Sequence, residues 1–198
     1  DNLVIFTNLG QYLYVPVHTI FEGKWKDLGK HINNLVTGLA ESEYIVGAFI
    51  FKDPEEKITF VTKNGLVKQS ILKDFVVSRY SKAMLAFKLK DNDEVIAVNA
   101  SKPRTLLISE AGYYVNIDTL EIPVVGARAS GVKGMNLKDD VLVAGLSLDS
   151  NEYLSIFTNN KTAKRVKISE LEIHNRAKKG STLIKKVKSF DYKIIKAI

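Results

Sequence analysis

The stretch IFTNLGQYLYVPVHTI, residues 5–20, predicts a β-hairpin. Aromatic and β-branched residues flank a short polar turn, with Thr7 before the turn and Gly10 three residues later. Glycine tolerates the positive φ that a tight turn requires. A single hairpin is compatible with many functions, whereas a repeated hairpin would restrict the fold.

The same pattern recurs three more times. The first three copies carry glycine three residues after a Thr or Ser, whereas Lys161 takes the place of glycine in the fourth. Asn159 and Asn160 precede that lysine, and asparagine tolerates positive φ better than most residues. The other copies are FVTKNGLVKQSILKDF (60–75), LISEAGYYVNIDTLEI (107–122) and IFTNNKTAKRVKISEL (156–171), and the Thr or Ser residues are Thr7, Thr62, Ser109 and Thr158.

Each hairpin is followed by a basic loop, a short motif and a third apolar strand. The motif is closed by leucine in the first three repeats, and its equivalent in the fourth lies near LIKKV (183–187). A period of about 40–50 residues in a β-rich chain indicates blades of about four strands, as in propellers. We therefore predict an all-β, propeller-like single domain with very little helix. An ordinary β-sandwich with chance similarity is the alternative. The expected third strands are 43–51, 93–100, 140–148 and 192–198, and the expected blade repeats are about 1–52, 53–102, 103–150 and 151–198.

Composition restricts the kind of protein and the kind of partner. The 198 residues are 45% hydrophobic, include no cysteine and have a formal net charge of +7. Disulfides and thiolate metal sites are therefore excluded, and no apolar run reaches the roughly 18–20 residues that span a bilayer. Residues 151–198 hold twelve Lys and Arg against four acids, so the fourth repeat carries +8 and residues 1–150 carry −1.

The loops between the hairpins and the third strands combine basic residues with small ones. Glycine and serine allow a phosphate to approach the backbone, and lysine and arginine supply the charge. Equivalent loops on successive blades could form one basic track, which favours a polyanionic partner. These four segments, called the rim loops below, are EGKWKDLGKH (22–31), VSRYSKAM (77–84), GARASGVKG (126–134) and NRAKKGST (175–182).

Several longer segments resemble a known family. The sequence is similar to the C-terminal β-pinwheel domain of the A subunit of bacterial type IIA topoisomerases, and most similar to topoisomerase IV of the Gram-positive kind. Gyrase carries the box Gln-Arg-Arg-Gly-Gly-Lys-Gly, whereas RASGVKG (128–134) keeps Gly131, Lys133 and Gly134 but lacks the Gln and the double Arg. That difference favours topoisomerase IV. The segments that carry the resemblance are FTNLGQYLYVPVHTI, KWKDLGKHINNLV, RYSKAMLAFKLKD, GARASGVKGMNLKDD and RAKKG.

The resemblance implies a non-catalytic domain that binds and wraps double-stranded DNA and presents it to a cleavage core for decatenation and supercoil relaxation. The chain is then expected to be a fragment of a five- or six-bladed domain. The implied partners are the rest of a homodimeric A chain and a separate ATPase chain, with ATP and Mg used by the full isomerase and no cofactor in this domain. The implied location is the bacterial cytoplasm, on the chromosome, with peripheral membrane association left open. The alternatives are the equivalent gyrase domain and a propeller-like scaffold that binds an acidic protein.

The predicted phosphate contacts are the basic residues of the rim loops, with two more on the strand before the last loop. Alternation in KRVKI (164–168) places Arg165 and Lys167 on the outward face. Trp25 could stack on a sugar, but we expect it to pack against its own blade. The predicted contacts are Lys24, Lys26, Lys30, Arg79, Lys82, Arg128, Lys133, Arg165, Lys167, Arg176, Lys178 and Lys179.

No catalytic residue and no metal ligand is predicted. The acidic residues that precede the third strands, such as Asp93 and Asp140, recur at equivalent turns and are expected to be solvated hairpin tips. The three histidines do not show metal-ligand spacing, and no phosphate-binding loop is present. None of the tyrosines is assigned the DNA-cleaving role, because the resemblance places that residue in another domain.

Overall fold

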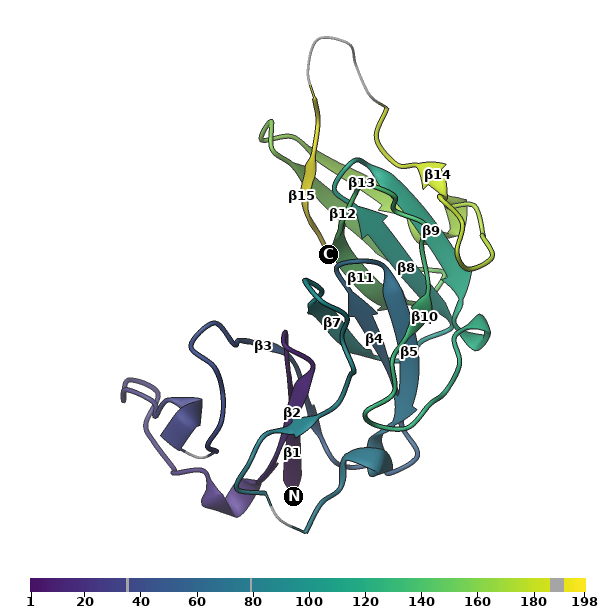
Figure 1. Cartoon of the computed structure of the whole chain (residues 1–198). Coiled ribbons are helices and arrows are strands. Elements are labelled where there is room, and N and C mark those ends of the chain that lie inside the picture. The colour runs from purple at the N-terminus through teal and green to yellow at the C-terminus, as the bar shows by residue number, and fades with distance from the viewer. Residues whose placement is uncertain (35, 79, 186–190) are drawn as a thin grey trace.

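The computed structural model describes residues 1–34, 36–78, 80–185 and 191–198. The strands in these residues form four antiparallel sheets, which follow one another along a curved row from the N-terminus to the C-terminus (Figure 1). The helices in the same residues are 3-10 turns of three or four residues. The prediction of an all-β, propeller-like fold is therefore confirmed. The helical turns are η1 (Val17–Thr19), η2 (Ile32–Asn34), η3 (Leu72–Phe75), η4 (Thr119–Glu121) and η5 (Ile168–Glu170).

A hairpin forms the centre of each sheet, as the repeats predict. The turn residues Gly10, Gly65, Gly112 and Lys161 all have positive φ, between 57° and 90°. The Thr or Ser before the turn also has a structural role, since Thr7 Oγ1 accepts a hydrogen bond from the amide of Gln11 at 3.2 Å. The hairpins are β1 (Asn2–Thr7) with β2 (Gln11–Pro16), β4 (Lys57–Thr62) with β5 (Leu66–Ile71), β8 (Arg104–Ser109) with β9 (Tyr113–Asp118), and β12 (Tyr153–Thr158) with β13 (Ala163–Lys167).

The third strand of each repeat pairs antiparallel with the first strand of its own hairpin. These third strands lie next to one another from sheet to sheet, so they form the inner edge of the curved row. The opposite edge of each sheet is therefore the outer rim. The third strands are β3 (Ile45–Ile50), β7 (Val95–Ala100), β11 (Leu142–Leu148) and β15 (Ile194–Ala197).

A fourth, outer strand comes from the following repeat. The strands β6 (Met84–Leu85), β10 (Val132–Lys133) and β14 (Ser181–Thr182) pair with β2, β5 and β9 respectively. The chain is anchored at each crossing by the turn carbonyl, and Gly10 O accepts the amides of Ala86 and Phe87 at 2.8 and 2.9 Å. The fourth sheet has three strands among the described residues. A blade thus combines two successive repeats, which a division of the sequence repeat by repeat does not anticipate.

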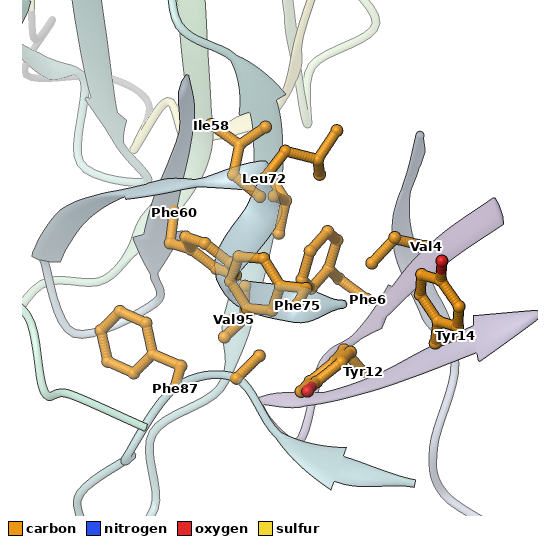
Figure 2. Packing of buried hydrophobic residues seen from close by; sticks show 12 residues of the cluster. Val4, Phe6, Tyr12, Tyr14, Ile58, Phe60, Leu72, Phe75, Phe87 and Val95 are labelled. Atoms are coloured by element: carbon orange, nitrogen blue, oxygen red, sulfur yellow. The ribbon is translucent and has the colours of Figure 1, made fainter. Parts of the chain in front are cut away.

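Aromatic side chains pack between the first two blades. The centre of the Phe6 ring in β1 lies 5.1 Å from the centre of the Phe60 ring in β4 and 5.0 Å from that of Phe75 in η3. Both pairs have edge-to-face geometry. Figure 2 shows Tyr12 and Phe87 around the same cluster. Edge-to-face pairs contribute about 0.5–1.5 kcal/mol beyond the burial of area. The cluster therefore packs the first blade against the second and holds the two at a defined angle.

The expectation of solvated acids before the third strands is wrong for Asp93 and Asp140. Asp93 is 9% exposed, and its Oδ1 accepts the amide of Asn64 at 2.9 Å. In the next repeat, Asp140 Oδ1 accepts the amide of Ala111 at 3.2 Å. These carboxylates tie the entry of the third strand to the hairpin turn and are structural.

Candidate nucleic-acid interface

The second, third and fourth rim loops lie at the outer edge of the row because each one leads from a hairpin to an exchanged strand. In the second repeat, the chain leaves β5, passes through η3 and the loop, and reaches β6 on the preceding sheet. The third and fourth repeats follow the same path to β10 and β14. Each of these loops therefore crosses the outer rim from its own blade to the previous one (Figure 1).

Backbone hydrogen bonds join the successive crossing segments into one strip. Between the first and second repeats, the amide of Thr37 donates to Ser81 O at 3.2 Å. Between the second and third, the amide of Lys88 donates to Ala129 O at 3.3 Å. Between the third and fourth, the amide of Asn136 donates to Lys178 O at 2.8 Å. The basic loops are thus neighbours along the rim and are not scattered over the surface.

The first rim loop is the most exposed part of the strip. Lys24, Lys26 and Lys30 are all exposed, and the Lys30 ammonium lies 3.4 Å from the centre of the Phe21 ring. Trp25 is fully exposed, at 104% of its reference area, so the prediction that it packs against its own blade is wrong. The loop closes through the Asp27 carboxylate, which accepts the amide of Lys24 at 2.7 Å, and this turn leaves the indole outside the fold.

In the second and third loops, two predicted contacts lie beside the first blade. Arg79 lies outside the described residues, while Lys82 is exposed and forms a β-bridge with Thr37. Arg128 is exposed and has a φ of 68°. Burial raises the pKa of Tyr12, and the positive charge of Arg128 opposes that shift, so the arginine acts across the boundary onto the first blade.

Lysine and arginine also project from the exchanged strand β10 and from the fourth repeat. Lys133, Lys167 and Lys178 are exposed. The Arg165 guanidinium lies 4.1 Å from the centre of the Tyr153 ring, and the Lys179 ammonium lies 4.2 Å from that of Tyr113. A cation held over a ring keeps its charge and gains a defined position.

Arg176 has a structural role that its sequence context does not indicate. Its Nε donates to Glu121 O at 3.0 Å and its Nη1 donates to Lys133 O at 2.9 Å. Two of the five guanidinium N–H groups are therefore used to hold the fourth rim loop against the third repeat. The remaining donors and the charge stay at the exposed rim.

Most of the predicted charges are not neutralised within the chain. In the part of the chain that the structure describes, lysine–carboxylate ion pairs occupy Lys63, Lys73, Lys102 and Lys193, none of which is a predicted contact. The charge of the rim loops is thus available to an external anion. Sequence reasoning missed one neighbour, the exposed Lys88, whose amide joins the second loop to the third. The sequence signal for Lys88 is that a polar residue precedes the closing leucine in the first three repeats, as Asn34, Lys88 and Asn136.

One cluster in the fourth repeat resembles a nucleophilic site but has the wrong proton arrangement. His174 Nε2 lies 2.9 Å from Ser181 Oγ, and Ser181 Oγ donates to Glu172 Oε2 at 2.7 Å. His174 Nδ1 accepts the amide of Asn116 at 3.3 Å, so the ring proton is on Nε2 and points at the serine. The histidine therefore cannot take the serine proton. The described residues also contain no group of three or more metal-ligating side chains and no helix long and apolar enough to cross a membrane.

A protein-family model described as the DNA gyrase C-terminal domain, β-propeller, matches this chain at residues 1–52, 56–102, 105–148 and 152–191. The A subunit of DNA topoisomerase 4 from Bacillus subtilis is 40% identical over 200 residues, which cover 98% of this chain and 25% of that protein. The protein of the same name from Staphylococcus aureus strain MSSA476 is 33% identical over 202 residues, which cover 100% of this chain and 25% of that protein. The chain thus spans about a quarter of the length of these relatives.

Solved structures show the same architecture. The crystal structure of the C-terminal domain of DNA topoisomerase IV matches with a TM-score of 0.93 and 37% identity, over 100% of this chain and 63% of that one. The E. coli ParC C-terminal domain matches with a TM-score of 0.78 at 15% identity, over 100% of this chain and 80% of that one. A DNA gyrase A C-terminal domain matches with a TM-score of 0.55 at 15% identity, over 100% of this chain and 81% of that one. The two matches at 15% identity show the fold alone.

Proposed function

The chain belongs to the family of DNA gyrase C-terminal β-propeller domains, and from that premise we propose that it binds duplex DNA along its rim loops. The observation that carries the proposal is the continuity of the strip. Hydrogen bonds join each crossing segment to the next, and the exposed lysines and arginines of the loops are free of ion pairs with carboxylates among the described residues. A row of cations suits the phosphate backbone and carries no sequence information.

The curvature of the row of blades determines the path that bound DNA would follow. Successive blades turn the rim, so a duplex that touches every loop has to bend along it. Bending a site of 20–30 base pairs costs on the order of 1–6 kcal/mol, which additional phosphate contacts offset. We therefore expect longer duplexes to bind more tightly than short ones, and flexible duplexes more tightly than stiff ones.

The relatives favour a role in topoisomerase IV over one in gyrase. Both named relatives are A subunits of DNA topoisomerase 4, and the solved C-terminal domain of DNA topoisomerase IV is 37% identical to this chain over the matched part. The glycines of RASGVKG also have a packing explanation. A Cβ on Gly131 would lie 2.7 Å from the Phe87 ring, and one on Gly134 would lie 2.8 Å from Leu107 and Val67. Their presence is thus no sign of the gyrase box.

In the whole protein, the proposed role of this domain is to present a bound DNA segment to the cleavage core for decatenation and supercoil relaxation. The domain itself is not catalytic. Cleavage, ATP and Mg belong to the rest of a type IIA enzyme, in which two A chains form a homodimer and a separate ATPase chain joins them on the chromosome in the bacterial cytoplasm. The alternative partner, an acidic protein, would use the same charges without needing the curvature.

Binding to fluorescent duplexes of two lengths tests the proposal. The chain should bind a random-sequence duplex with strong salt dependence and prefer the longer one, and a second duplex sequence should bind equally well. An acidic protein or polyglutamate of equal charge should compete poorly. Tight binding to polyglutamate without any preference for duplex length would support the acidic-protein alternative instead.

A further inference from the structure

Lys68 of β5 is a lysine buried in the interior at the outer side of the second blade. Its exposed fraction is 0%, and its ammonium donates to Ala86 O at 2.6 Å and to Gly126 O at 3.3 Å. The rings of Phe60 and Phe87 lie 5.0 and 5.1 Å from the nitrogen. A buried charge is costly unless it is bonded, and this one is bonded to two carbonyls and faces two rings.

The other repeats show that the position does not need a lysine for packing. Three residues after the turn residue, the first and third repeats have the buried Leu13 and Val115. The fourth repeat has Lys164, whose ammonium donates to Leu183 O at 3.0 Å, the carbonyl equivalent to Ala86 O. Lys164 is exposed, because no later loop covers it among the described residues. The contact that distinguishes Lys68 is therefore the one to Gly126, in the third rim loop.

Gly126 begins the turn that carries Arg128. The amide of Ala129 donates to Gly126 O at 3.4 Å, and the side chain of Ser130 donates to Lys88 O at 3.1 Å. The start of the loop is also held at Val125, whose amide donates to Gln69 O at 2.9 Å and whose carbonyl accepts Ser70 Oγ at 2.7 Å. Its far side is held by the Lys88 amide, which donates to Ala129 O at 3.3 Å. Lys68 acts between these two anchors, at the turn itself. The Lys68 ammonium donates to the same carbonyl that closes the turn.

We propose that Lys68 is a positioning residue for the third rim loop, which it holds through Gly126 O so that Arg128 lies at the rim beside Tyr12. The effect on DNA binding rests on the proposed function, whereas the effect on the loop does not. Lys68 has no exposed surface, so a role as a reactive nucleophile is not supported.

The charge state of Lys68 provides a second signature. Burial lowers the pKa of Lys68 from 10.5 to about 8, and the carboxylate of Asp74 in η3 opposes that shift. The other groups that face the amine are the rings of Phe60 and Phe87 and the carbonyls of Ala86 and Gly126, and none of these titrates. Loss of the proton near pH 8 should therefore be felt at the loop amides, which a lysine that only fills space would not cause.

The test compares Lys68→Met, which keeps the apolar stem and removes the amine, with the matched Lys164→Met. NMR of the 198-residue chain should show that Lys68→Met shifts the Ala129 and Lys88 amides and increases their hydrogen exchange about fivefold or more, while core amides such as Val61 stay protected. Lys164→Met should leave these loop amides unchanged. In the wild type, the Ala129 and Lys88 shifts should titrate with a midpoint near 8, and this transition should be absent in Lys68→Met.

The affinity for duplex DNA is measured as a second, separate test. Lys68→Met should weaken binding about two- to tenfold, as Arg128→Ala does, and the double variant should bind no worse than Arg128→Ala alone. Loop amides that neither shift in Lys68→Met nor titrate in the wild type would overturn the proposal. If Lys68→Met fails to fold, the wild-type titration decides. If the wild type does not bind DNA, the proposed function is wrong. The NMR measurements on the loop amides still decide the role of Lys68.

Discussion

Arg176 Nη1 donates a hydrogen bond to the carbonyl oxygen of Lys133 at 2.9 Å and so joins the fourth rim loop to the exchanged strand of the third repeat. The same guanidinium reaches Glu121 O at 3.0 Å. One side chain thus fixes two repeats relative to each other at the place where DNA is proposed to bind. The arrangement uses the planar fork of arginine, and lysine carries the charge without the fork.

Arg176→Lys separates the geometry of that contact from its charge. Lysine keeps +1 but cannot span both carbonyls, so we expect the variant to lose about 1 kcal/mol of stability and to bind duplex DNA more weakly than the wild type. Denaturant unfolding and fluorescence anisotropy measure the two effects. Lys178→Ala is the control, because it removes a charge from the same loop without removing the fork. Wild-type affinity in Arg176→Lys would mean that only charge matters at this position.

Lys161 occupies the turn position that glycine holds in the other three repeats. Its φ of 57° lies in the left-handed region, which costs a residue with a Cβ about 1–2 kcal/mol. We therefore expect Lys161→Gly to raise the free energy of unfolding by about 1 kcal/mol. Lys161→Ala removes the same charge and keeps the Cβ, so it should not be stabilising. Equal stabilisation by both variants would assign the effect to the charge instead.

The buried amine of Lys68 makes stability depend on pH in a defined direction. Because its pKa is lowered from 10.5 to about 8 in the folded state, the unfolded chain binds more protons between these values. Stability from this group therefore rises as pH increases from about 8 to 10.5, by about 2–3 kcal/mol. The measurement is the wild-type free energy of unfolding minus that of Lys68→Met across this window. A difference that stays constant with pH would show that the folded amine is not perturbed.

The hairpins and their order along the chain could be predicted because their chemistry is local. A Thr or Ser, a residue with positive φ and flanking β-branched residues specify a turn within ten residues, and the repetition specifies the row of blades. The same logic located the basic loops. It also located Lys133 and Lys178 as exposed residues of those loops.

The exchange of strands could not be predicted in this way. The strand β6 is two residues long, well below the four to eight residues that make a strand recognisable in a sequence. Its partner strand, β2, lies in the preceding repeat. Arg176 depends on a carbonyl 43 positions away along the chain. Lys68 depends on two carbonyls, 18 and 58 positions away. No local sequence pattern encodes contacts at such separations. Trp25 was predicted to pack against its own blade because its side chain is apolar, but it is fully exposed.

The central claim is that DNA follows the rim loops, and the salt dependence of binding tests it most directly. Arg128→Ala with Lys133→Ala removes two rim charges. The Lys133 change spares its carbonyl, which accepts Arg176. The control, Lys57→Ala with Lys196→Ala, removes two charges from the strands β4 and β15. Each lost phosphate contact flattens the slope of log K against log salt by about 0.9.

We predict that the rim pair lowers the magnitude of this slope by about one to two units without changing sequence preference, while the control pair leaves it nearly unchanged. Arg176→Ala with Lys178→Ala and Lys179→Ala should lower it further, because the fourth repeat carries +8. An equal loss of slope in the rim pair and the control pair would contradict the account, since DNA would then respond only to net charge.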